Sequence, residues 1–113
     1  MEQARLFVYG TLRRGYKNIY AELLRANSRF LGNARMHGRL CQFKSYSGAV
    51  LSDQPDEWVP GELFHLQDPN ILQTLDEYEG SEFERVLVKV SLDHGKDPET
   101  FLETWVYLFR GRT

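Results

Sequence analysis

Residues 6–12 read Leu-Phe-Val-Tyr-Gly-Thr-Leu, and this stretch decides how the chain is organised. It is an apolar run, too short for a helix of its own, that stops at a glycine and a hydroxyl residue. The pattern predicts a buried strand that leads into a tight turn. We expect Gly10 to give the turn a backbone conformation closed to other residues, so that successive N–H groups point into one concavity and bind an anion such as a carboxylate. A plain strand-to-loop connection is the alternative interpretation.

A second stretch, Leu-Asp-Glu-Tyr-Glu-Gly at residues 75–80, can place a carboxylate beside this turn. Asp68-Pro69 is a strong helix start signal and Gly80 is the expected stop, so we expect a helix that runs to about Tyr78. The helical period predicts a buried stripe of Ile71, Leu72, Leu75 and Tyr78, with Asp76 and Glu77 on the opposite, solvent-exposed side.

Glu79 follows Leu75 by four residues and Ile71 by eight, so it continues the apolar face of this helix if the last turn stays helical. A frayed helix end with the side chain in water is the alternative. In a buried position, desolvation and the negative end of the helix dipole both disfavour the charged carboxylate. The pKa of Glu79 would then rise toward the range useful to a general base.

The remaining segments alternate between helical and strand patterns. Asn18 is a suitable N-cap for a helix over residues 19–26, and the apolar stripe of this helix should pack on a sheet: Ile19, Tyr20, Leu23 and Leu24. Strand patterns cover residues 30–43, 49–51, 58–66, 83–92 and 104–109, with polar loops at 44–48, 52–57 and 93–98. This order predicts an α+β domain with a mostly antiparallel sheet that is curled or closed.

The composition is that of one globular domain. The 113 residues are 42% hydrophobic and 27% charged, which predicts a single domain over residues 1–113 with a core of its own. The net charge of -2 offers no basic footprint for nucleic acid. No apolar run reaches the length of a signal peptide or a membrane span. We therefore expect a cytoplasmic protein, a monomer or weak dimer, with neither nucleic acid nor membrane as a partner.

Motifs for cofactor or metal chemistry are absent from the sequence. It contains no Gly-Xaa-Ser-Xaa-Gly elbow, no Walker loop and no dinucleotide fingerprint. The histidines His37, His65 and His94 are scattered, and no pair is spaced like a zinc site. The single cysteine, Cys41, lies in a strand pattern and is expected to be a packed thiol rather than a nucleophile. Among enzymatic functions, a reaction without cofactor or metal, run by a carboxylate and backbone groups, is favoured.

Four motifs lie in order along almost the whole chain. The first is Tyr9-Gly10-Thr11-Leu12 followed by Arg14-Gly15 and Asn18, and the second is Val59-Pro60-Gly61-Glu62-Leu63-Phe64. The third is residues 75–80, and the fourth combines Phe83-Glu84-Arg85 with Trp105-Val106-Tyr107. Together they resemble the motifs of the gamma-glutamylcyclotransferase-like family, of the gamma-glutamylamine cyclotransferase type. One departure is visible, since many members have Tyr-Pro-Gly where this chain has Tyr46-Ser47-Gly48.

This resemblance implies a small mixed, mostly antiparallel β-barrel with flanking helices. It also implies a reaction in which a small-molecule gamma-glutamyl substrate cyclises to 5-oxoproline and releases a free amine, without cofactor. By the same resemblance, the loop Tyr9-Gly10-Thr11-Leu12 binds the glutamyl group and Glu79 is the catalytic base. Tyr46 and Tyr107 are further candidates for hydrogen bonds to the substrate, with packing in the barrel as the alternative for both.

The leaving group stays open at this point, because an amine, an amide and a peptide would all share the glutamyl end. An enzyme that acts on a larger gamma-glutamylated metabolite would use the same chemistry. The alternative from another class is a non-catalytic module of the same fold that binds a small carboxylate ligand.

Overall fold

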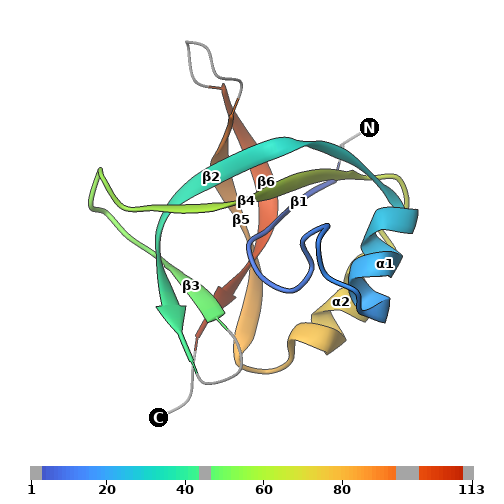
Figure 1. Cartoon of the computed structure of the whole chain (residues 1–113). Helices are drawn as coiled ribbons and strands as arrows, with labels where there is room; N and C mark the ends of the chain where they lie inside the picture. The colour runs from blue at the N-terminus through green and yellow to red at the C-terminus, as the bar shows by residue number, and fades with distance from the viewer. Residues whose placement is uncertain (1–3, 44–46, 94–99, 111–113) are drawn as a thin grey trace.

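The computed structural model describes residues 4–43, 47–93 and 100–110, and it has the α+β architecture expected from the sequence (Figure 1). The elements follow in the order β1 (Arg5–Val8), α1 (Ile19–Ala26), β2 (Ser28–Gln42), β3 (Ser47–Leu51), β4 (Trp58–Leu66), α2 (Ile71–Glu79), β5 (Phe83–Leu92) and β6 (Thr100–Phe109).

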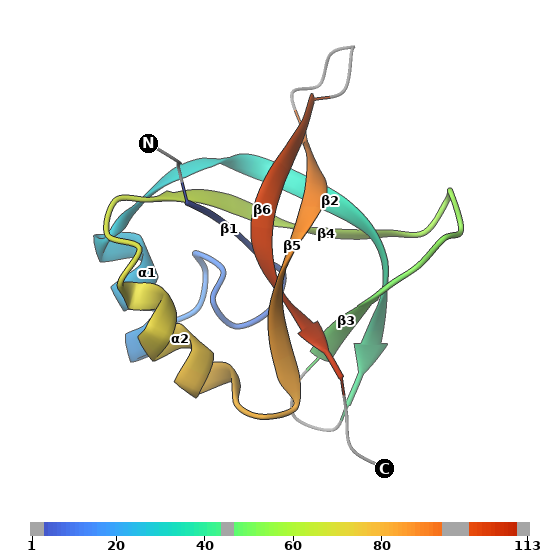
Figure 2. The same ribbon diagram turned by 180° about the vertical axis from the view of Figure 1, so that it is seen from behind.

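The strands form a closed, mixed sheet. β4 pairs antiparallel with β1 and β2, and β2 pairs antiparallel with β3. β6 then pairs in parallel with both β3 and β1, which closes the ring. β5 lies antiparallel along the whole of β6, and its far end reaches β2. Figures 1 and 2 show α1 and α2 together on one side of this ring. The prediction of a small mixed, mostly antiparallel β-barrel with flanking helices is confirmed.

From Leu6 to Val8, β1 is buried on both faces, which explains the unbroken apolar sequence of these residues. Successive side chains of a strand point to opposite faces, so Phe7 belongs to one apolar cluster and its neighbours Leu6 and Val8 to another. The barrel interior is filled by Phe7, Tyr9, Ala34, Met36, Ala49, Val59, Leu63, Val90, Val106 and Leu108. The space between barrel and helices is filled by Leu6, Val8, Leu12, Leu24, Phe64, Leu66, Ile71, Leu72, Leu75 and Tyr107.

α1 has the bounds and the N-cap that the sequence predicts. The Asn18 side chain accepts hydrogen bonds from the N–H groups of Tyr20 and Ala21 at 3.0 and 2.8 Å. The helix packs on α2 as well as on β2. Ile19, expected in the buried stripe, is instead 71% exposed. That expectation was wrong because the apolar period shows a stripe but not how much of it a neighbouring element covers.

The other corrections concern where elements begin. α2 starts at Ile71 rather than after Asp68, because residues 68–70 form a turn in which the Asp68 side chain accepts the Asn70 N–H at 3.1 Å. β3 starts at Ser47 and β6 at Thr100, both earlier than predicted. β3 pairs antiparallel with β2, and this pairing extends it into residues that were predicted as a polar loop. β6 pairs antiparallel with β5, and this pairing extends it into residues that carry no strand pattern.

Candidate active site

A cavity of about 260 Å³ lies between the end of β1, the loop that follows it, the end of α2 and β6. Its lining consists of Phe7, Val8, Tyr9, Gly10, Thr11, Leu12, Ser47, Tyr78, Glu79, Glu82, Phe83 and Tyr107. The structure thus brings together the predicted loop Tyr9–Leu12, Glu79 and Tyr107, which come from three distant parts of the sequence. Tyr46, the remaining candidate, lies outside the described residues.

Glu79 is the last residue of α2, and its half-buried carboxyl lines the cavity. Gly80 ends the helix directly after it, with a φ of 86°. Burial raises the pKa of Glu79 to about 7. Within the described residues, the carboxyl accepts no hydrogen bond that would stabilise its charged form. A carboxyl in this state exchanges protons readily near neutral pH.

Tyr107 lines the cavity, but its hydroxyl is already engaged. It donates to the Asp76 carboxylate at 2.7 Å, and Arg85 donates to both oxygens of the same carboxylate at 2.7 and 3.1 Å. Burial, and then the hydrogen bond to Asp76, raise the pKa of Tyr107. Burial alone would raise the pKa of Asp76, but the hydrogen bonds from Arg85 and Tyr107 outweigh it, and the pKa lies below its ordinary value.

Asp76 was predicted on the solvent-exposed side of α2, and its side chain is 40% exposed, but it lies at the edge of that side and is engaged there. It lies one residue after the buried Leu75, at the border of the apolar stripe, where Arg85 of β5 and Tyr107 of β6 reach it. The periodicity of one helix does not show which strand lies at the border of its stripe. The sequence signal for this contact was the presence of an acid, Asp76, in α2 and of an arginine, Arg85, in the strand that follows.

The hydroxyl of Tyr9 is also engaged, inside the barrel wall. It donates to the backbone oxygen of Tyr107 at 2.6 Å and accepts the N–H of Ala49 at 2.9 Å. Burial raises the pKa of Tyr9, so the phenol stays neutral. Tyr9 therefore contributes its ring to the cavity and its hydroxyl to the structure.

The loop after β1 turns without the special backbone conformation expected of Gly10. Among the described glycines only Gly32 and Gly80 have a positive φ. Gly10 instead opens an ordinary reverse turn, in which its oxygen accepts the N–H of Arg13 at 3.1 Å. The expectation failed because the first position of such a turn has no need of glycine.

The same loop nevertheless carries free backbone donors. In the part of the chain that the structure describes, the N–H groups of Gly10, Thr11 and Leu12 form no hydrogen bond, although all three residues line the cavity. The Thr11 hydroxyl is paired with that of Tyr78 at 2.6 Å, which joins the loop to α2. The free polar groups offered by this loop are therefore backbone N–H groups, which suit an anion such as a carboxylate.

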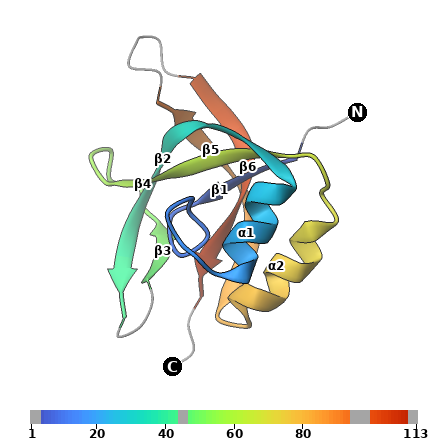
Figure 3. The same cartoon turned by 45° about the vertical axis from the view of Figure 1, so that its right-hand side comes forward.

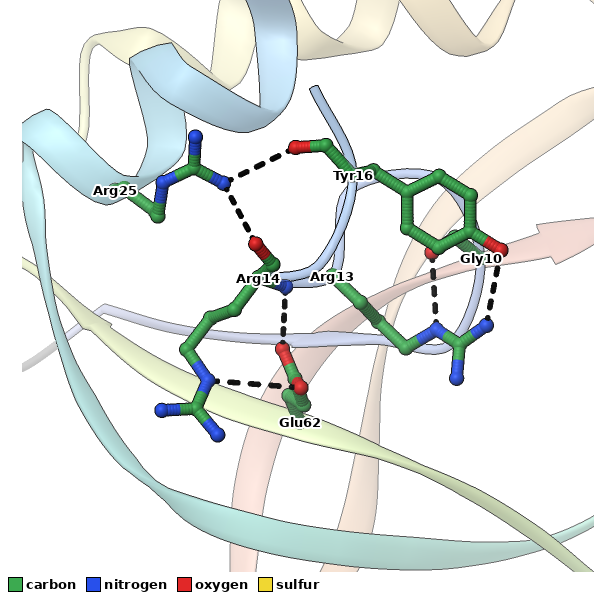
Figure 4. A network of polar contacts seen from close by, with 6 residues as sticks. All are labelled: Gly10, Arg13, Arg14, Tyr16, Arg25 and Glu62. Carbon is green, nitrogen blue, oxygen red and sulfur yellow. Dashed lines mark hydrogen bonds and ion pairs between the residues drawn. The ribbon is translucent and has the colours of Figure 1, made fainter. Parts of the chain in front are cut away.

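Figure 3 shows this loop in front of the barrel, beside α1. Figure 4 shows the side chains that hold it. Arg13 donates to the oxygen of Gly10 at 3.1 Å, and Glu62 of β4 accepts the N–H of Arg14 at 2.8 Å. Arg25 of α1 donates to the oxygens of Arg14 and Tyr16 at 3.0 and 3.2 Å. The loop is thus fixed to both the barrel and a helix.

Six cavity residues are not among the predicted site residues: Phe7, Val8, Ser47, Tyr78, Glu82 and Phe83. Ser47 and Phe83 begin strands, and both lie in segments that were compared with the family motifs, but neither was singled out as a site residue. Glu82 follows Glu79 by three residues, but it lies beyond Gly80, where the helical period no longer applies. Among the described residues, no group of histidine, cysteine or acidic side chains could hold a metal ion. Nor does any described helix have the length and apolar character needed to cross a membrane.

Comparison with known proteins assigns this chain to a family. A profile of the family described as "Gamma-glutamyl cyclotransferase, AIG2-like" matches residues 6–113, nearly the whole chain. The chain belongs to this family. Its membership supports a gamma-glutamyl cyclotransferase-like activity and agrees with the resemblance found in the motifs.

Proteins of known sequence or structure are similar to this chain over most of its length. MJ1514 of Methanocaldococcus jannaschii, whose name gives gamma-glutamylcyclotransferase as a provisional assignment, is 28% identical over 106 residues, covering 92% of this chain and 82% of that protein. YkqA from Bacillus subtilis is 28% identical with a TM-score of 0.74 over 96% of this chain, which spans only 36% of YkqA. An AIG2-like protein from Mus musculus shares the fold, with a TM-score of 0.75, 23% identity and coverage of 96% and 78%.

Proposed function

We propose that this protein is a gamma-glutamyl cyclotransferase that converts a gamma-glutamyl amine, amide or peptide into 5-oxoproline and a free amine. The observation that carries the proposal is the Glu79 carboxyl. It lines the cavity without a hydrogen-bond partner among the described residues, has a pKa of about 7, and shares the cavity with the unpaired N–H groups of Gly10, Thr11 and Leu12. Family membership supports the same assignment.

The reaction needs little more than these groups. The backbone N–H groups bind the α-carboxylate of the substrate, and Glu79 takes a proton from the α-ammonium to make it nucleophilic. The nitrogen attacks the γ-carbonyl carbon, a C–N bond closes the ring, and the bond to the departing amine breaks. Holding the two ends of the substrate together for this intramolecular attack lowers the barrier by up to roughly 7–11 kcal/mol.

Protons balance through the same carboxyl. The α-ammonium begins with three hydrogens and the ring nitrogen of 5-oxoproline keeps one. The departing nitrogen gains two hydrogens and leaves as an ammonium ion. Glu79 can carry both protons in turn, since a pKa of about 7 lets it accept and release them at neutral pH.

The test is turnover by the wild type, Glu79→Gln and Glu77→Gln with gamma-glutamyl amines, gamma-glutamyl dipeptides and glutathione, with 5-oxoproline detected by mass. Glu77 is an exposed acid on the same helix and serves as the matched control. We expect product from one substrate class, a loss of about 10²–10⁴-fold in Glu79→Gln and normal turnover in Glu77→Gln. Full activity of Glu79→Gln would show that another group is the base. A wild type that binds 5-oxoproline but forms no product would be a binding module instead.

A further inference from the structure

Glu62 forms a contact that the proposed reaction does not use directly. It lies in β4 opposite Val8, the last residue of β1, and its side chain is only 15% exposed. One carboxylate oxygen accepts the N–H of Arg14 at 2.8 Å, and the other lies 3.6 Å from the Arg14 guanidinium (Figure 4). The strand beside β1 thus holds the loop that leaves β1.

Arg25 holds the same residue from the opposite side. Its guanidinium donates to the backbone oxygen of Arg14 at 3.0 Å and to that of Tyr16 at 3.2 Å. The peptide groups of Arg14 are therefore bound through the N–H by the barrel and through the oxygen by α1.

The segment between β1 and this fixed point contains the free donors. It runs from Tyr9 to Arg13 and is tightened by the N–H of Arg13 and by its side chain, which both donate to the Gly10 oxygen at 3.1 Å. Because both ends are fixed, the N–H groups of Gly10, Thr11 and Leu12 are held in one arrangement before any ligand arrives. Donors arranged in advance bind a charged group better than donors that must be ordered first.

We propose that Glu62 is a positioning residue for substrate binding. Through the N–H of Arg14 it keeps the loop in the conformation in which the backbone donors of Gly10–Leu12 bind the α-carboxylate of the substrate. The acceptor oxygen of Glu62, rather than its negative charge, performs this role. The Arg14 side chain is 48% exposed, and an ion pair with so much access to water contributes little. This inference rests on the proposed function.

Glu62→Gln and Glu62→Ala separate the acceptor from the charge. Glutamine keeps an oxygen for the Arg14 N–H and should retain nearly wild-type kcat/KM. Alanine removes the acceptor, and a loop displaced by about 1 Å should lower kcat/KM on the order of 10²-fold, mainly through KM. Glu57→Ala is the control, because Glu57 directly precedes the same strand and pairs with Arg39 and Ser52 instead of the loop. Equal losses in Glu62→Gln and Glu62→Ala would overturn the proposal.

A second substrate tests the link to the α-carboxylate. The wild type should prefer a substrate with a free α-carboxylate over its α-methyl ester, since the loop donors favour an anion. In Glu62→Ala this preference should shrink toward one, whereas a general loss of folded protein would lower both rates alike and leave the ratio unchanged. An unchanged ratio in a folded Glu62→Ala protein would contradict the proposal.

Amide hydrogen exchange gives a result without any turnover. Exchange of the Arg13 N–H, which donates to the Gly10 oxygen at 3.1 Å, should accelerate in Glu62→Ala and stay slow in Glu62→Gln, and unchanged exchange in Glu62→Ala would overturn the positioning role even if no substrate is found. If Glu62→Ala does not fold, Arg25→Met is the second variant, because it removes the hydrogen bond from α1 to the Arg14 oxygen. It should show the same faster exchange and the same smaller preference for the substrate with a free α-carboxylate. A silent wild type with this exchange pattern would refute the reaction but leave the role of Glu62 standing.

Discussion

The Glu79 carboxyl has a pKa of about 7 in the folded protein, against 4.5 for an ordinary glutamate. Between pH 4.5 and about pH 7, the folded state therefore still binds a proton at this carboxyl, whereas the unfolded state has lost it. Stability from this group is complete below about pH 4.5 and disappears as the pH rises through 7, a loss on the order of 3 kcal/mol. A glutamine side chain carries no charge at any pH, so the Glu79→Gln variant should not show this loss of stability.

Urea unfolding of both proteins at pH 5 and pH 8 measures the effect. The quantity compared is the free energy of unfolding of Glu79→Gln minus that of the wild type. We expect this difference to be larger at pH 8 than at pH 5, by on the order of 2 kcal/mol. Tyr9 and Tyr107 do not disturb the comparison, because the pKa of each phenol is raised by burial and both stay neutral. The same difference at both pH values would mean that the Glu79 carboxyl is not buried as the structure has it.

At the scale of elements, the close approach of β1 to β4 depends on Gly61. A Cβ atom at this position would lie 2.6 Å from Cζ of Phe7 and still closer to the backbone oxygen of Val8. Gly61→Ala should therefore push the two strands apart and lower the free energy of unfolding by at least about 1–3 kcal/mol in urea. Gly15→Ala is the control, since an added carbon there meets nothing within 4 Å. Equal stability of the two variants would show that β4 adapts at no cost.

Several elements were predictable because one local pattern decides them. α1, β4 and β5 have the predicted bounds, since a clear N-cap or an uninterrupted strand pattern marks each of them. α2 was placed too early, because Asp68-Pro69 favours a turn as well as a helix start. The end of α2 followed from Gly80, and the spacing of the apolar stripe placed Glu79 on the buried face of its last turn. The contact of Asp76 with Arg85 did not follow from these patterns, because it depends on which strand passes α2.

At the scale of the whole molecule, the strand patterns predicted a sheet that is curled or closed, but not which strands close it. The ring closes through parallel pairs of β6 with β1 and β3, which lie far apart in the chain. Strand periodicity shows which side chains share a face, but it contains no information about the partner strand. The cavity follows from this closure, because β1, β6 and the end of α2 meet only once the barrel has formed. The resemblance to a family, rather than periodicity, brought these segments together in advance.

The weakest connection in the ring is the one between β3 and β6, which pair only at Ala49 and Leu108. The Tyr9 hydroxyl spans this connection, since it accepts the Ala49 N–H at 2.9 Å and donates to the Tyr107 oxygen at 2.6 Å. Tyr9→Phe leaves both buried groups without this partner, at a cost of about 1–3 kcal/mol each. We therefore expect a lower free energy of unfolding in urea, and amide exchange that accelerates first in β3 and the facing part of β6.

Tyr16→Phe is the matched control for this prediction. Tyr16 is 40% exposed, and among the described residues its hydroxyl accepts a hydrogen bond from the Arg13 side chain alone, at 3.3 Å, so water can replace the lost contact. A Tyr9→Phe protein as stable as Tyr16→Phe, with exchange in β3 unchanged, would show that the ring stays closed without the hydroxyl. The expected outcome, a selective opening between β3 and β6, would make one phenol of the cavity wall responsible for holding the barrel shut beside the Glu79 carboxyl.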